Sequence, residues 1–292
     1  FIKMSALTQL FSMSGAALLL SMSAVILRQS SPMLLGWSIG LEQIAMLAFP
    51  ILIVFSVMPF VTVAATLISP VASQLDALDK HEKLYNLSVI VVRYVLFIAC
   101  IIWSGFYYLG YEIFTLWLGG PKVDSAALMQ ISDNVIIIFT GFVICSPGFI
   151  FRQLLIAVGW HWQVAFGEII GALIGVSLGY ILMVVSGLGV LGMTIGIATA
   201  FVVRGLGFLT VQCARYFEIP YVELVSNCFG RPIIVITVAL ILTESLLVVL
   251  SNYYSGIFLN VVSFINILFI SLIGAWFWII DPNHKRMLRE SL

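Results

Sequence analysis

The chain has 292 residues, of which 62% are hydrophobic and 9% are charged, and its formal net charge is zero. Soluble domains carry about 25% charged residues, so this composition excludes an ordinary soluble domain. Apolar runs of about 20 residues, the length that spans a bilayer, recur along the chain. We therefore expect an all-α, polytopic membrane helix bundle.

Eight apolar segments are long enough to cross a membrane. Prolines interrupt the second segment at Pro50 and Pro59 and the fourth at Pro147. Each proline removes a helix hydrogen bond, and the freed carbonyl needs a partner inside a membrane. In chain order the segments are 8–28, 41–69, 88–110, 129–157, 161–186, 189–214, 232–251 and 257–280.

Lysine and arginine are distributed unevenly between the two ends of these segments. The side richer in Lys and Arg is cytoplasmic in membrane proteins, so we expect both termini to lie in the cytoplasm. The chain starts at Phe1 without a recognisable targeting signal, and we expect it to be a piece of a longer protein. The poorer side holds Arg28 and Lys122, and the richer side holds Lys3, Lys80, Lys83, Arg152, Arg215, Arg231, Lys285, Arg286 and Arg289.

The stretch SGLGVLGMTIG, from Ser186, contains a GxGxxG pattern that marks dinucleotide binding when it joins a strand to a helix. Here an apolar run of helix length precedes it, and no acidic residue lies between Glu168 and Glu218. We therefore expect Gly187 and Gly189 to form a tight turn between two helices, and Gly192 to belong to the second helix.

Small residues recur every four positions on both sides of this turn, at 167, 171, 175 and 179 and at 192, 196 and 200. Such faces let membrane helices approach closely, so we expect an antiparallel hairpin. Glu168 lies 19 residues before Gly187 and Arg204 lies 17 after it. At a rise of about 1.5 Å per residue both reach nearly the same depth. We predict that they pair, either as a structural ion pair or in a site that faces substrate or protons.

Two further charges fall within predicted spans, where an uncompensated charge costs at least about 2.5 kcal/mol. Arg93 lies near a helix end, from which its side chain can extend to the surface. Glu244 lies near mid-bilayer and is either functional or a neutral buried carboxyl. His161 has no second histidine at ligand spacing, and the four cysteines are scattered, so we expect no metal site.

Two polar regions have simpler interpretations. Residues 69–88 have apolar positions near helical spacing, which predicts an amphipathic helix on the cytoplasmic surface or, alternatively, a moving gate. Asp133 and Asn134 are expected at the outer interface of their span.

Several stretches together carry a resemblance to a family. LISPVASQLDALDKHEKLYNL (67–87) resembles a cytoplasmic loop of Wzx-type polysaccharide flippases, which belong to the multidrug/oligosaccharidyl-lipid/polysaccharide exporter superfamily. IFTLWLGG (113–120) is similar to an outer-face segment of that family. RQLLIAVGWHWQVA (152–165), followed by GLGVLGMTIGIATA (187–200), is similar to one of its hairpins.

The resemblance implies the last eight helices of a fourteen-helix transporter. Residues 1–216 would be its second six-helix lobe, 217–231 a cytoplasmic linker, and 232–292 two additional helices and a tail. A first lobe of the same chain would be missing. Such transporters flip polyprenyl-pyrophosphate-linked oligosaccharides across the bacterial cytoplasmic membrane by alternating access, driven by a cation gradient.

The same resemblance suggests sites and partners. Arg204 and Arg93 are the candidates for phosphate contact, with Glu168 beside Arg204, since guanidinium groups match phosphate geometry. Glu168 and Glu244 are the candidates for ion coupling. Lipid-linked oligosaccharide, membrane lipid and a polysaccharide polymerase are the expected partners, with no nucleic acid and no cofactor.

Other functions remain open at this stage. A multidrug exporter of the same superfamily would have the same fold and would use Glu168 or Glu244 as a proton-coupled carboxylate. A glycan polymerase would need an outer loop rich in catalytic groups, whereas residues 110–129 hold one Lys, one Glu and one Asp. We therefore expect no enzyme activity, while a non-transporting scaffold subunit is a further alternative.

Overall fold

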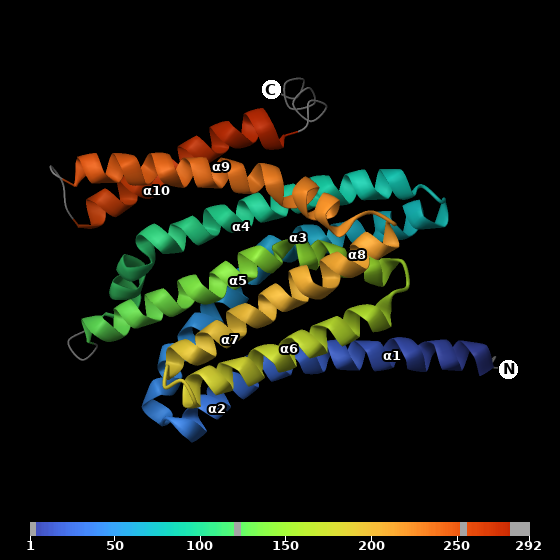
Figure 1. The fold of residues 1–292 in the computed structure, drawn as a ribbon, viewed down its shortest axis with the longest axis horizontal. Helices are drawn as coiled ribbons and strands as arrows, with labels where there is room; N and C mark the ends of the chain where they lie inside the picture. Colours follow the sequence, from blue (N-terminus) through green and yellow to red (C-terminus); the bar gives the residue numbers. More distant parts are fainter. Residues whose placement is uncertain (1–3, 120–123, 252–255, 281–292) are drawn as a thin grey trace.

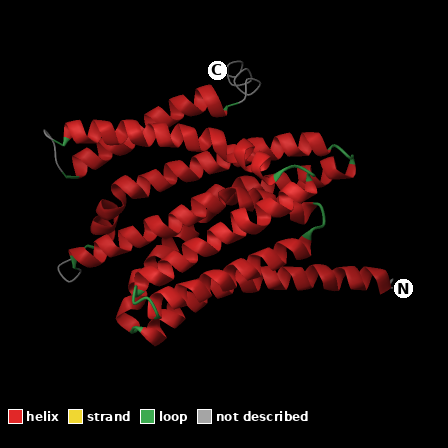
Figure 2. Cartoon of the chain, viewed as in Figure 1, coloured by secondary structure: helices red, strands yellow, loops and turns green. Residues whose placement is uncertain are grey.

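The computed structural model describes residues 4–119, 124–251 and 256–280, and the regular elements within these ranges are all helices (Figure 2). Five of the basic residues that indicated the membrane orientation lie outside the described residues: Lys3, Lys122, Lys285, Arg286 and Arg289. The orientation therefore stays a prediction.

Eight helices within the described ranges are long and apolar enough to cross a membrane, which confirms the predicted number of spans. Several consist of consecutive elements with a change of helix type between them. In chain order the elements are α1 (Met4–Val25), π-helix η1 (Ile26–Ser30), α2 (Ser31–Ser38), 3₁₀-helix η2 (Leu41–Gln43), α3 (Ile44–Ala77), α4 (His81–Leu118), α5 (Ser125–Ala157), α6 (His161–Val184), α7 (Val190–Val202), π-helix η3 (Val203–Thr210), α8 (Val211–Tyr216), α9 (Tyr221–Leu250), α10 (Ile257–Gly274) and π-helix η4 (Ala275–Ile279).

Helix α5 forms the centre of the bundle and contacts α3, α4 and α7 (Figure 1). Its most apolar 18-residue stretch is 72% buried, against 22% for α9 and α10. At one edge α1 packs on α6, and at the opposite edge α9 and α10 pack on each other and on α4. The helices at the two edges thus meet different central neighbours, which separates the charged sites described below.

The α6–α7 hairpin forms as predicted. The turn falls between Val184 and Val190, and Gly187 and Gly189 have φ values of 67° and 57°, a region that favours glycine. A Cβ added at Gly175 would lie 2.7 Å from the carbonyl oxygen of Gly196. A helix, not a strand, precedes the GxGxxG pattern, so the dinucleotide fingerprint lacks its structural context.

The prolines do not interrupt their helices, because side chains satisfy two of the freed carbonyls. Pro50 leaves the Met46 carbonyl, four residues earlier, without its helical donor. The Asn134 side-chain amide of α5 donates to this carbonyl at 3.1 Å. Pro147 frees the Val143 carbonyl in the same way, and the neighbouring Ser146 hydroxyl donates to it at 2.8 Å.

Asn134, which the sequence suggested at the outer interface of its span, is buried within the protein. It is 1% exposed, and its amide oxygen accepts a hydrogen bond from the Thr194 hydroxyl of α7 at 3.1 Å. Its neighbour Asp133 is exposed, and the position of both residues relative to a membrane surface stays a prediction. In its buried position, Asn134 supplies the hydrogen-bond donor that the Met46 carbonyl lacks because of Pro50.

The segment 69–88 does not form a separate surface helix. Helix α3 continues to Ala77 and α4 begins at His81, so the two spans share this segment and a short turn. Ala72 and Leu84 are fully buried, because the apolar positions pack against the protein core. Helix α9 begins at Tyr221, within the expected linker 217–231.

Candidate functional site

Three charged side chains from three elements meet between α5, α6 and η3, and we call them the arginine–glutamate cluster: Arg152, Glu168 and Arg204. The Arg204 Nη1 donates to Glu168 Oε2 at 2.7 Å, which confirms the predicted pairing. Arg152 Nε lies 3.9 Å from the other carboxylate oxygen, Oε1. One carboxylate thus faces two guanidinium groups.

Small residues bring the cluster together. A Cβ on Gly171 of α6 would overlap with Cγ of Arg204, so only glycine leaves room for the arginine stem. A Cβ on Gly148 of α5 would lie 2.8 Å from Cα of Gly205, the residue after Arg204. Arg152 follows Gly148 by one helical turn, and this close approach brings it beside Glu168.

The widened helical turn η3 carries Arg204. Within it the Thr210 hydroxyl donates to the Gly205 carbonyl, five residues earlier, at 2.7 Å. Segments of π-helix are rare and often occur at functional sites. The guanidinium carbon of Arg204 also lies 4.8 Å from the Phe201 ring centroid, a cation–π distance. The η3 backbone, the Phe201 ring and the Glu168 carboxylate together hold Arg204 in place.

The cluster has an excess positive charge. With both arginines and Glu168 ionised, its formal charge is +1. The side chains of Glu168 and Arg204 are 5% and 8% exposed, whereas that of Arg152 is 31% exposed. The Nε–H groups of both arginines are buried and donate no hydrogen bond within the described residues. Arg152 is therefore the member that an anion can reach.

Sequence reasoning placed Arg152 among the surface charges and did not connect it to Glu168. The signal in the sequence was its spacing of four from Gly148, which places both on one face of α5. The sequence does not show that η3 packs against this face of α5 and brings Arg204 near Arg152.

Arg93 lies elsewhere, between α4 and α9. Its Nε donates to the Asn227 main-chain carbonyl at 2.7 Å, and the Asn227 amide donates to the Tyr85 hydroxyl at 2.8 Å. Arg93 borders a cavity of about 410 Å³ in this region. The structure therefore does not unite Arg93 with Arg204 in one site, because α4 and η3 face different neighbours.

Glu244 also belongs to a separate site, a cavity of about 520 Å³ between α4, α5, α9 and α10 that we call the acidic pocket. The Tyr108 hydroxyl donates to Glu244 Oε1 at 2.9 Å. The Asn260 amide donates to the Glu112 carboxylate at the same pocket. The pocket is lined by Tyr107, Tyr108, Tyr111, Glu112, Met129, Ser132, Asp133, Ile136, Glu244, Leu247 and Asn260.

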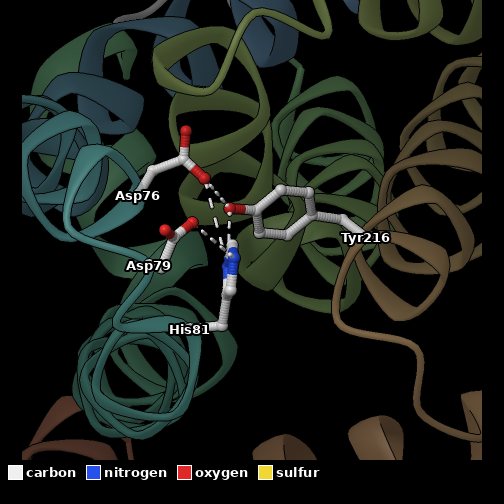
Figure 3. A network of polar contacts seen from close by, with 4 residues as sticks. All are labelled: Asp76, Asp79, His81 and Tyr216. Carbon is white, nitrogen blue, oxygen red and sulfur yellow. Dashed lines mark hydrogen bonds and ion pairs between the residues drawn. The ribbon is translucent and has the colours of Figure 1, made fainter.

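A polar network fastens the α3–α4 turn to the end of α8 (Figure 3). The Tyr216 hydroxyl donates to Asp76 and lies 3.3 Å from His81 Nδ1. His81 Nε2 lies 3.9 Å from Asp79, whose φ of 53° is unusual for a residue other than glycine. The network thus connects spans that are far apart in the sequence, at the end expected to face the cytoplasm.

Other reactive groups form no further cluster in the part of the chain that the structure describes. The four cysteines are unbridged and buried. No group of three His, Cys, Asp or Glu residues there has the geometry to hold a metal ion.

Comparison with known proteins adds no family to this geometry. No protein-family model, curated protein or solved structure matches the chain. The functional argument therefore rests on the residues and their arrangement.

Proposed function

We propose that this chain is part of an alternating-access transporter that flips a polyprenyl-pyrophosphate-linked oligosaccharide across the bacterial cytoplasmic membrane. The observation that carries the proposal is the arginine–glutamate cluster, with its formal charge of +1 among membrane-spanning helices. A lone excess cation in a span is costly, and such residues commonly mark a substrate pathway.

The members of the cluster have different roles in this proposal. Arg204 is almost fully buried, and it holds the Glu168 carboxylate in place. Arg152 is the more exposed guanidinium and contacts the pyrophosphate, since guanidinium groups bind phosphate with two parallel hydrogen bonds. The sequence suggested Arg204 for the phosphate contact, and we assign this contact to Arg152 instead. Arg93 adds a second positive charge on another pair of helices.

Prolines within the spans support movement of the helices. Inside α3, Pro50 has its freed carbonyl satisfied by Asn134, so the proline leaves no unpaired polar group there. Sharp kinks of helices occur mostly at prolines, so Pro50 is the position at which α3 would bend when the helices move.

Export of surface polysaccharide in a flippase-deleted host tests the proposal. The full-length gene would carry Arg152→Ala, Arg152→Lys or, as the matched control, Arg215→Ala, which removes an exposed arginine from α8. We expect Arg152→Ala to lower export at least about tenfold at an unchanged membrane level, because a direct phosphate contact is worth about 1.5–3 kcal/mol. Arg152→Lys should retain part of the export.

Two outcomes would contradict the proposal. Equal export from Arg152→Ala and from the control would remove Arg152 from the substrate path. Unchanged export after deletion of the whole gene would refute the flippase function itself.

A further inference from the structure

The acidic pocket is a second cavity with chemistry of its own. Its volume of about 520 Å³ falls within the range of small-molecule sites, about 300–1,000 Å³. Helices α4, α5, α9 and α10 form its walls, and no described residue of α7 lines it. It shares no lining residue with the arginine–glutamate cluster.

The pocket carries only negative charge. Its three carboxylates come from three helices: Glu112 from α4, Asp133 from α5 and Glu244 from α9. Among the described residues that line it, none is Lys, Arg or His. Each of Glu112 and Glu244 accepts a hydrogen bond from a neutral group, which leaves its charge uncompensated.

Aromatic rings form one wall, on α4. Tyr107 stacks on Trp103 with ring centroids 5.2 Å apart and an angle of 17° between the rings. Tyr108 meets Tyr107 edge to face, with centroids 5.0 Å apart. Tyrosine faces attract cations through the ring quadrupole, and this packing holds them rigidly in place.

A serine hydroxyl that lines the pocket lacks a partner among the described residues. Ser132 lines the pocket, is 5% exposed and has no hydrogen bond within the described part of the chain. Its neighbour Asp133 is exposed and has no ion-pair partner among the described residues. A hydroxyl that lines a cavity and has no partner in the described chain is available to a donor group of an occupant.

We propose that the acidic pocket binds an organic cation through its ammonium group. The carboxylates accept hydrogen bonds from the ammonium, the tyrosine rings face its positive charge, and Ser132 accepts a further hydrogen bond. The volume suits an alkylammonium group better than a bare metal ion, for which no three-ligand group exists in the described ranges. This inference does not rest on the transport proposed above.

Isothermal titration of the purified chain with hexylammonium, in dodecyl maltoside micelles, tests the site directly. We expect saturable binding, and no saturable binding of hexanol, which has the same alkyl chain without the charge. Glu244→Gln and Asp133→Asn should each weaken binding about fivefold or more, because each removes a charge next to the ammonium. Ser132→Ala, a change small enough to preserve packing, should weaken it about threefold.

Glu223→Gln is the matched control, since Glu223 is an exposed carboxylate in the first turn of the same helix as Glu244, outside the pocket. It should bind as the unaltered chain does. The proposal is overturned if hexylammonium does not bind, if hexanol binds equally well, or if the pocket variants bind like the control while remaining monodisperse.

Competition distinguishes a soluble amine from a lipid headgroup. Dihexanoyl phosphatidylethanolamine, which carries an ammonium, is added in one series and dihexanoyl phosphatidylglycerol, which does not, in another. Displacement of hexylammonium by the first lipid alone assigns a lipid headgroup as occupant, and displacement by neither assigns a soluble amine. Equal displacement by both lipids would overturn recognition of the ammonium.

Discussion

The arginine–glutamate cluster and the acidic pocket place charge inside the same bundle in opposite ways. In the cluster, charges of both signs are in contact, and two of the three side chains are almost completely buried. In the pocket, carboxylates surround a cavity of about 520 Å³ without a basic residue among its described lining. The cluster therefore compensates most of its charge internally, whereas the pocket leaves its charge for an occupant.

Side-chain size produces this difference. Gly148, Gly171 and Gly205 let α5, α6 and η3 approach closely, which buries Glu168 and Arg204 and leaves Arg152 partly exposed. Between α4, α5, α9 and α10, by contrast, the larger side chains of Tyr107 and Tyr108 line a cavity that stays open. Substitutions in the cluster should thus affect folding, and substitutions in the pocket should affect binding.

The largest effect is expected from Glu168→Ala, which leaves two arginines without their carboxylate. Breaking a buried ion pair by removing one partner typically costs about 3–5 kcal/mol. The unfolding midpoint in detergent should fall accordingly, and the double variant Glu168→Met with Arg204→Met should recover most of it. An unchanged midpoint for the single variant would show that the cluster does not stabilise the fold.

A smaller loss is expected from Gly171→Ala, because the new methyl group would overlap with the Arg204 stem. Overpacking of this kind costs about 1–3 kcal/mol. Gly230→Ala on α9 is the control, since a methyl group there meets nothing within 4 Å. Equal unfolding midpoints for the two variants would contradict the close approach of α6 and η3.

In the pocket, Tyr108→Phe should have a modest effect on stability. It removes one hydrogen bond, to Glu244, and such a loss costs about 0.5–1.5 kcal/mol. The freed carboxylate adjoins an open cavity, where water can solvate it. If Tyr108→Phe lowered the free energy of unfolding as much as Glu168→Ala does, Glu244 would depend on its partner as strongly as Glu168. The contrast between the two sites would then be lost.

The smallest effect on stability is expected from Asp133→Asn, which alters an exposed pocket carboxylate with no ion-pair partner in the described ranges. Its midpoint should match that of the unaltered chain to within about 0.5 kcal/mol in unfolding free energy. Measured beside the hexylammonium titration, this variant separates binding from folding at a single residue.

Local sequence relations were sufficient to predict the α6–α7 hairpin and the Glu168–Arg204 pair. A short turn fixes the register of two consecutive helices, so counting residues from Gly187 gives the depth of each charge. The eight spans followed from hydrophobicity and length alone. These predictions succeed because each depends on neighbouring segments of the chain.

Several contacts that sequence reasoning missed depend on helices that are not consecutive. Arg152 and Glu168 lie on consecutive helices, but Arg204 joins them from η3, which packs against α5. Tyr108 reaches Glu244 because α9 packs against α4. Tyr216 binds Asp76 across 140 positions of sequence. Hydrophobic periodicity shows that a helix has a buried face, but it does not identify the helix that covers that face.

The contact between Asn134 and the Met46 carbonyl makes Pro50 and Asn134 dependent on each other. Replacing Pro50 by alanine would return a backbone N–H that competes for the same carbonyl, and the Asn134 amide would lose its acceptor in a buried place. Replacing Asn134 alone would leave the carbonyl without a donor. A substitution that usually strengthens a helix would here weaken the protein, and the two positions should tolerate change only when both change together.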